Sequence, residues 1–273
     1  MFLTRCAAGA LVAVALLAGC ETVQTTRGGA IGVDRTQRMS TMISEADLEQ
    51  QAALSYREEM GKARQKGSLN ADPALTGRVR AISNRLIQAS GAFRPDAARW
   101  SWEVNVVRSD EVNAWCMPGG KIAVYTGLIT KLNLTDDELA AVLGHEIAHA
   151  LREHARERAS EQLGAQVLIG GAATVLGGGQ TSVDLGKIFY GTFFGLPNSR
   201  LHETEADRIG VELAARAGYD PRAAITLWQK MARSGGSGGP EFLSTHPSAE
   251  TRTRDLEVYA ARVMPLYEQA RRR

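Results

Sequence analysis

The segment His145-Glu146-Ile147-Ala148-His149 holds the residues best suited to chemistry. Two histidines four residues apart lie one turn apart on the same face of a helix, so both imidazoles can reach one metal ion. Glu146 lies beside that face, where its carboxylate can take a proton from an activated water. The pattern predicts a zinc peptidase site in which His145 and His149 are ligands and Glu146 is the general base.

A catalytic zinc site needs three protein ligands and one open position. Glu203 and Asp207 are four residues apart in a second predicted helix, so both can face the metal helix. We assign Glu203 as the third ligand. Asp207 would accept a hydrogen bond from the outer nitrogen of a ligand histidine. The small residues Ala206 and Gly210, on nearly the same face, would let the two helices approach closely. The sequence therefore predicts one zinc ion per chain.

The elements that must position this site are mostly helices. A capping box, Thr135 with Glu138, precedes the metal helix, and apolar residues follow it at helical spacing. Two more helices are predicted over residues 44–66 and 73–90. Alternating apolar residues over 100–106, with Trp100 and Trp102 in the core, predict a strand, and extended segments follow at 112–117 and 121–126. The expected fold class is α+β, mostly helical, with a small antiparallel sheet beside the metal helix.

The N-terminus reads as a targeting segment. Residues 1–19 have a basic start and a short apolar run, and Leu17-Ala18-Gly19-Cys20 resembles the bacterial lipobox. We expect a lipoprotein signal peptide over residues 1–19, lipidation at Cys20, a tether over 20–43 and a peptidase domain over 44–273. An ordinary signal peptide with an incidental cysteine is the alternative. Glu21, in place of the aspartate that retains lipoproteins in the inner membrane, favours the outer membrane.

Cysteine content and charge exclude several classes of protein. After loss of Cys6 and acylation of Cys20, only the thiol of Cys116 remains, so the mature chain has no disulfide. The net charge of +2 argues against a nucleic-acid-binding protein.

Residues 164–198 are apolar but interrupted by glycines, which fits either a lid or plug over the site or buried core helices. No long apolar span follows the signal, which disfavours a membrane-embedded protease.

Four segments together resemble the zinc metallopeptidase family that includes HtpX, BepA, LoiP and the CAAX prenyl protease. The first is Asn113-Ala114-Trp115-Cys116-Met117-Pro118-Gly119-Gly120, and the second is the segment from His145 to His149. The third runs from Ser199-Arg200 through Glu203 to Ala206-Asp207, and the fourth is Thr245-His246-Pro247 with Arg252. The resemblance covers most of the chain from about residue 45 onward, and the ordered set is far more specific than any one segment.

The resemblance implies a gluzincin-type zincin fold, with an edge strand above the zinc that pairs with an extended peptide. Asn113 and Ala114 are the candidates for that strand. Arg200 is expected beside the ligands. His246 is expected as a fourth zinc ligand that keeps the enzyme silent, as an oxyanion stabiliser, or as a structural histidine. Cys116 is expected to be a packed thiol.

Two further histidines are not assigned to the site. His154 is five residues after His149, at another angle of the helix, and is expected at the surface or in packing. His202 is expected to point away from the face that carries Glu203.

The resulting functional hypothesis is a zinc-dependent endopeptidase of the bacterial cell envelope. It would be lipid-anchored, face the periplasm, and degrade misfolded or misassembled outer-membrane proteins. Polypeptide substrates and the envelope assembly machinery are the expected partners. The alternative is a chaperone or assembly factor that uses the same groove with little proteolysis.

Overall fold

The computed structural model describes residues 19–170, 184–234, 241–246 and 252–272. The elements in chain order are β1 (Cys20–Val23), β2 (Gln37–Ser40), α2 (Glu45–Gln65), α3 (Pro73–Ser90), the 3₁₀-helix η1 (Pro95–Arg99), β3 (Glu103–Val107), β4 (Ala114–Met117), β5 (Lys121–Tyr125), α4 (Thr126–Lys131), α5 (Asp136–Leu151), α6 (His154–Gly170), α8 (Leu185–Gly195), α9 (Arg200–Arg216), α10 (Ala223–Ser234), α11 (Glu241–Thr245) and α12 (Arg252–Arg271). The mostly helical α+β class that the sequence predicts is confirmed.

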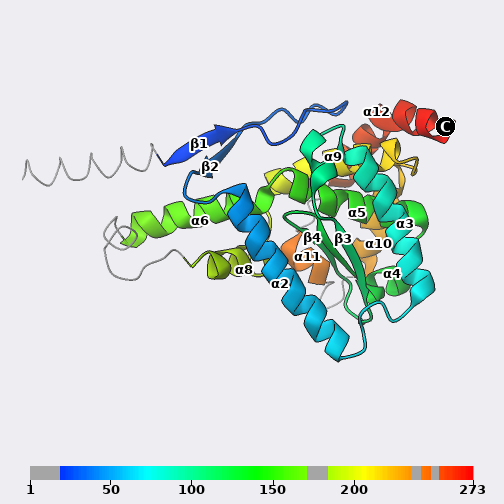
Figure 1. Ribbon diagram of the computed structural model, residues 1–273. Helices are drawn as coiled ribbons and strands as arrows, with labels where there is room; N and C mark the ends of the chain where they lie inside the picture. Colours follow the sequence, from blue (N-terminus) through cyan, green and yellow to red (C-terminus); the bar gives the residue numbers. More distant parts are fainter. Residues whose placement is uncertain (1–18, 171–183, 235–240, 247–251, 273) are drawn as a thin grey trace, which may run out of the picture.

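Helix α5 lies at the centre of the molecule, surrounded by α3, α9, α10 and the sheet (Figure 1). Every residue from Glu138 to Leu151 is buried. The predicted capping box forms, because the Thr135 side chain accepts a hydrogen bond from the Glu138 backbone and the Glu138 carboxylate accepts one from Thr135. A helix enclosed on all sides must be apolar around its circumference, so its charged residues need partners within the protein.

The sheet has the strand order β3-β5-β4. β4 pairs with β5 in the antiparallel sense, and the turn between them is made by Gly119 and Gly120, whose φ angles of 72° and 79° suit glycine. β3 pairs with β5 in the parallel sense. The expected small antiparallel sheet is therefore found for β4 and β5, but the expectation is wrong for β3, which runs parallel to β5. The chain reverses at each connection, but β5 inserts between β3 and β4, so the first and third strands become neighbours.

Helix α9 packs directly against α5 through two glycines. A Cβ atom on Gly210 would lie 2.7 Å from the backbone nitrogen of His145, and one on Gly144 would lie 2.8 Å from the carbonyl oxygen of Gly210. These distances leave no room for a side chain at either position. The close approach brings the ligand residues of the two helices within reach of one another.

The N-terminal segment differs from the expected tether. β1 and β2 form an antiparallel hairpin, and β2 packs against α6 (Figure 1). Ile31, Val33 and Met39 are buried. The Glu212 carboxylate on α9 accepts hydrogen bonds from the backbone nitrogens of Ala30 and Ile31 at 2.7 and 3.0 Å. The apolar residues within this polar segment and its backbone nitrogens make these contacts. Residues 1–18, expected as most of the signal peptide, lie outside the described residues.

The expected lid or plug is described only in part, because residues 171–183 lie outside the described residues. Its second half forms α8, which contacts α2 and α6, with Phe189 fully buried.

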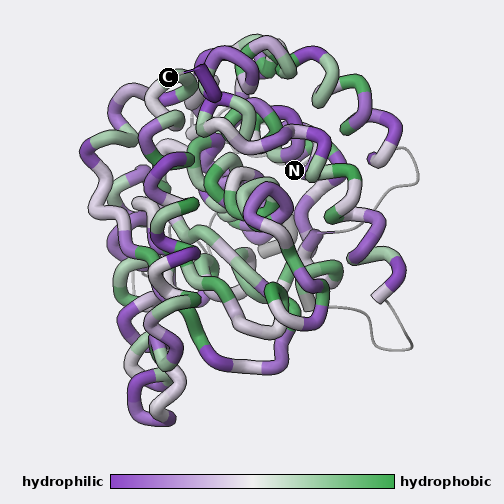
Figure 2. Tube along the Cα trace, turned by 90° about the vertical axis from the view of Figure 1, so that its right-hand side faces the viewer, coloured by the Kyte–Doolittle hydropathy of each residue, from purple (hydrophilic) through white to green (hydrophobic). Residues whose placement is uncertain are grey.

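Hydrophilic and hydrophobic residues alternate along the helices in Figure 2. Across the described parts of the chain, no helix combines the length and the apolar character needed to cross a membrane.

Candidate metal centre

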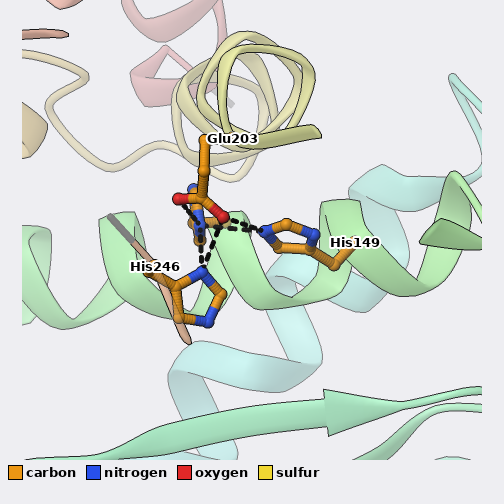
Figure 3. Close-up of side chains that lie close together, drawn as sticks. His149, Glu203 and His246 are labelled. Atoms are coloured by element: carbon orange, nitrogen blue, oxygen red, sulfur yellow. Dashed lines mark hydrogen bonds and ion pairs between the residues drawn. The ribbon is translucent and has the colours of Figure 1, made fainter. Parts of the chain in front are cut away.

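Four side chains from three separate parts of the chain converge on one point. His145 and His149 come from α5, Glu203 comes from the first turn of α9, and His246 follows α11. Figure 3 shows His149, Glu203 and His246 pointing toward one another. The Nε2 atoms of His145 and His149 are 3.1 Å apart. The Glu203 carboxylate oxygens lie 3.4 Å from the first of these atoms and 3.3 Å from the second. A tetrahedral zinc site with bonds of 2.0–2.1 Å has edges of about 3.3–3.4 Å, so these donors fit such an ion.

The hydrogen bonds of the two outer nitrogens determine which ring nitrogens point at this shared position. His145 Nδ1 donates to Asp207 Oδ1 at 3.0 Å, which leaves a lone pair on its Nε2. His149 Nδ1 lies 2.8 Å from His154 Nδ1, and His154 Nε2 lies 3.1 Å from a Glu205 oxygen. With His154 donating to Glu205, its Nδ1 accepts from His149, and the Nε2 of His149 also keeps a lone pair. Two ring nitrogens and a carboxylate that face one another at this range favour a positive charge between them, either a metal ion or a proton on His145.

The pKa shifts agree with room for a single positive charge. Burial opposes the charged form of His145, yet Glu203 and Asp207 outweigh it and raise the pKa of His145 to about 9. Burial lowers the pKa of His149 well below its usual value. Burial also opposes ionisation of Glu203, but His246 and His145 hold the pKa of Glu203 well below its usual range. Glu203 is therefore ionised and faces one positive charge, which is a proton on His145 when no metal is bound.

Arg252 forms ion pairs with both Asp207 and Glu203 at this centre. Its guanidinium donates to both oxygens of Asp207 at 2.5 and 2.7 Å, pairs with Glu203 at 2.8 Å, and stacks on the ring of Trp228. Asp207 lies where the sequence placed it, against the outer nitrogen of His145. Arg200, expected beside the ligands, is exposed at the first position of α9. Arg252 takes that place because α12 packs along α9.

His246 is within reach of both the ligands and Glu146. Its Nδ1 lies 3.2 Å from His145 Nε2 and 2.9 Å from a Glu203 oxygen, and its Nε2 lies 3.4 Å from a Glu146 oxygen. The ring stacks on Phe242, with the ring centroids 4.4 Å apart. The Nδ1 atom is therefore placed to act as a fourth donor, and the Nε2 atom faces the space beside Glu146.

Glu146 faces a pocket bounded by the free side of β4. Burial raises the pKa of Glu146 above its usual value, against the opposing effect of His246 and His145. A raised pKa suits a carboxylate that must accept and then return a proton. The pocket is lined by residues of β4 and its flanks, α5, α6, α8 and the segment before His246: Asn113, Ala114, Trp115, Cys116, Pro118, Glu146, His149, Ala150, Glu153, His154, Ala155, Arg158, Phe193, Phe194, Asn198, Thr245 and His246.

The backbone of β4 has one side paired and one side open. Asn113 accepts a hydrogen bond from the Tyr125 backbone at 3.0 Å, so its backbone faces β5. Because the groups of an antiparallel strand alternate, those of Ala114 and Cys116 face the opposite edge. Within the described residues, β4 has no strand on that edge. The Cys116 thiol is buried and its pKa is raised well above its usual value by burial, in keeping with the expected packed thiol.

The sequence did not predict the residues that form hydrogen bonds behind His149, on the side of its ring away from the metal position. His154, expected at the surface or in packing, is buried and contacts His149 directly. The metal helix ends at Leu151, and Glu153 adopts φ of 51°, so the chain turns and brings His154 back. No helical spacing could reveal this turn. His202 points away from the metal ligands, as expected, and bonds Glu157 at 3.2 Å.

Comparisons with known proteins agree with the site. The profile described as Peptidase family M48 matches residues 73–260. The chain is 42% identical over 156 residues to the mitochondrial metalloendopeptidase OMA1 of Arabidopsis thaliana, covering 57% of this chain and 31% of that protein. The OMA1 of Schizosaccharomyces pombe is 36% identical over 183 residues, covering 66% and 52%. The beta-barrel assembly-enhancing protease of Escherichia coli K12 is 28% identical over 208 residues, covering 73% and 42%.

The chain spans about half or less of the length of these relatives. The family profile, in contrast, covers well over half of this chain and includes His145, Glu146, His149, Glu203, Asp207 and His246. The predicted metallopeptidase is thus confirmed at the level of the family, and the chain belongs to Peptidase family M48.

Proposed function

We propose that this chain is a zinc-dependent endopeptidase of the bacterial cell envelope that cuts misfolded or misassembled outer-membrane proteins. The observation that carries the proposal is the convergence of His145, His149 and Glu203 within zinc-binding distances, with Glu146 beside them. Both ligand histidines have their outer nitrogens occupied, and Arg252 compensates the carboxylates. These contacts would hold the ligands in position before a metal binds.

The reaction is hydrolysis of a peptide bond. His145, His149 and Glu203 would hold a zinc ion, which when bound would lower the pKa of water and polarise a carbonyl group. Glu146 takes the proton from the attacking water and passes it to the leaving amine. Its burial at 3% exposure supports this role, because a carboxylate kept away from bulk water has its pKa raised toward the working pH.

The substrate would bind as an additional strand along β4. The backbone groups of Ala114 and Cys116 face the open edge next to Glu146, so an extended peptide can pair with them. Asn113 would contribute its side chain rather than its backbone, which already binds Tyr125. This mode of binding requires an unfolded or extended segment, which suits a protease that removes misfolded proteins.

His246 would act as a displaceable fourth ligand. Its Nδ1 is 2.9 Å from Glu203, within the same set of donors as the two ligand histidines. A zinc ion bound by four protein donors has no open position for water. We therefore propose a silent resting enzyme that a substrate activates when it displaces His246.

One zinc ion per chain is proposed. A second group of possible ligands, His154, Glu157 and His202, also lies close together. Its donors are already used: the Glu157 carboxylate accepts from Arg35 at 2.6 and 2.9 Å and from His202. A guanidinium in direct contact with that carboxylate disfavours a second cation there.

The envelope location is proposed from the N-terminus and one relative. Cys20 is free and exposed, as a lipid attachment site must be. The Escherichia coli relative is named for its part in β-barrel assembly, which favours outer-membrane proteins and their assembly machinery as partners. The same name favours a second candidate, an assembly factor whose groove holds client strands with little cleavage. Labelling with radioactive palmitate, lost in Cys20→Ser, tests the anchor.

The test of the enzyme is Glu146→Gln, with the exposed Glu161→Gln as the matched control. We expect Glu146→Gln to bind zinc normally while cleavage of an unfolded outer-membrane protein falls by about 10²- to 10⁴-fold, the usual contribution of a general base. Glu161→Gln should cleave as the wild type does. Undiminished cleavage by Glu146→Gln would sink the mechanism. Full support of outer-membrane assembly by that variant in cells would favour the assembly factor.

A further inference from the structure

A buried chain of hydrogen bonds leads from the metal ligand His149 to the N-terminal hairpin. His149 Nδ1 is 2.8 Å from His154 Nδ1, and His154 Nε2 is 3.1 Å from a Glu205 oxygen. Glu205 in turn accepts hydrogen bonds from Arg152 at 3.0 Å and from Arg35 at 2.6 Å. His154 is 1% exposed and Glu205 is 4% exposed, so water does not compete for these contacts.

The backbone is shaped to deliver His154 to this place. Glu153 has a φ of 51°, a left-handed conformation that costs a residue with a side chain about 1 kcal/mol or more. Arg94 holds Glu153 there through an ion pair of 2.8 Å, and the same guanidinium nitrogen donates to the Leu151 carbonyl at the end of α5. A helix that continued through this point would carry residue 154 away from His149. The turn therefore serves the contact with the ligand.

We propose that His154 is a positioning residue that fixes the tautomer of His149, with Glu205 and Arg35 holding His154 in turn. The inference rests on the proposed zinc site. Since Glu205 accepts from His154 Nε2–H, the Nδ1 of a neutral His154 can only accept. His149 must then carry its proton on Nδ1 and present the lone pair of Nε2 to the metal.

The charges around His154 support its neutral state. The carboxylates of Glu157 and Glu205 face it, but two guanidinium groups, Arg35 and Arg152, balance them. Arg35 bridges both carboxylates with two contacts to each. It comes from the segment between β1 and β2, so a docked hairpin is part of the support for the metal ligand.

His202 provides a matched control because it shares the surroundings of His154. The two rings stack with centroids 4.3 Å apart, and His202 is 3% exposed. Its ring bonds Glu157 and, among the described residues, makes no hydrogen bond to the side chain of a proposed zinc ligand. Replacing either histidine by phenylalanine removes a buried imidazole of the same cluster, but only His154→Phe removes the acceptor for His149.

The experiment compares His154→Phe, His154→Asn and His202→Phe by competition for zinc with a chromophoric chelator. We expect His154→Phe to raise the zinc dissociation constant about 10- to 100-fold, the usual loss for a partner behind a metal ligand. His202→Phe should change it less than about threefold. In His154→Asn the side-chain oxygen takes the place of Nδ1 and accepts from His149, so most of the affinity should return.

A second arm concerns the hairpin and uses Arg35→Gln, with the exposed Arg38→Gln as its control. Arg35→Gln should weaken zinc binding, and Arg38→Gln should not. In the zinc-free wild type, ¹⁵N NMR should find the His149 proton on Nδ1. This measurement needs no variant to fold.

The outcomes separate this inference from the zinc site itself. A wild-type chain that binds no zinc refutes the proposed function. Wild-type binding together with equal effects of His154→Phe and His202→Phe, or an Nε2–H tautomer for His149, overturns only the role of His154. Loss of affinity in His154→Phe with recovery in His154→Asn supports it.

Discussion

Replacing Gly210 by alanine should separate the two helices that carry the metal ligands. The new Cβ would lie 2.7 Å from the His145 backbone nitrogen and 2.9 Å from the Gly144 carbonyl carbon. These are backbone atoms in the middle of α5, so no side chain can swing away. To reach an ordinary van der Waals distance, α9 must move by about 0.7 Å or more.

The size of the effect follows from two opposing contributions. Crowding a packed interface costs about 1–3 kcal/mol. Exchanging glycine for alanine within a helix stabilises by about 1 kcal/mol. The expected net loss of stability is thus about 0–2 kcal/mol. The effect on zinc binding should be larger, because metal–ligand distances tolerate a change of only about ±0.2 Å and Glu203 belongs to the displaced helix. We expect zinc affinity to fall about 10- to 100-fold.

The assay is chelator competition for zinc combined with thermal unfolding. The control is Gly77→Ala in α3, where a new Cβ meets nothing within 4 Å. This control should gain about 1 kcal/mol of stability and keep its zinc affinity. If Gly210→Ala behaved like Gly77→Ala in both measurements, the close packing of α5 on α9 could not be what positions Glu203.

Three more predictions concern the same centre. Although burial opposes it, Glu203 and Asp207 raise the pKa of His145 from 6.5 to about 9, so zinc must displace a proton from His145 below that pH. The zinc affinity, measured from pH 6 to 10, should therefore rise about tenfold per pH unit and level off above about pH 9. Because the pKa of His145 is higher in the folded protein, its proton stabilises the metal-free protein fully below pH 6.5, and this stability is lost as the pH rises through about 9. A zinc affinity that did not change with pH would contradict the raised pKa. Arg252→Met should lower the free energy of unfolding in urea by about 3–5 kcal/mol, because two buried carboxylates lose their counter-charge; a loss below 1 kcal/mol would argue against the brace. His246→Ala should raise peptidase activity and weaken zinc binding, whereas a fall in kcat with unchanged zinc affinity would assign His246 to the oxyanion instead.

The metal ligands could be predicted from the sequence because helical spacing depends only on residues that are close together in the chain. Four-residue spacing in a helix puts His145 and His149 on one face whatever surrounds them, and the same spacing relates Glu203 to Asp207. The capping box at Thr135 depends on residues three positions apart, and it formed as predicted. The glycine that permits close packing, Gly210, was recognisable from its place on the same face.

The tertiary structure decided everything that depends on how distant segments meet. The pairing of β3 with β5 could not be read from alternating residues, since every strand of a small sheet shows the same pattern. Arg252 rather than Arg200 braces the ligands, because α12 packs on α9 at a distance in sequence that no spacing encodes. The polar stretch over 20–43 looked like a tether, yet its charges meet buried partners on α6 and α9.

His154 shows the limit most clearly. In a continuous helix its position would face away from His149, and the sequence contains no glycine at residue 153 to announce a turn. The left-handed Glu153 is held by Arg94, which lies 59 positions earlier in the chain. Local spacing thus determined which residues could bind a metal. Only the packing of remote segments decided which side chains hold those ligands in place, because such support comes from contacts that the chain makes after it folds.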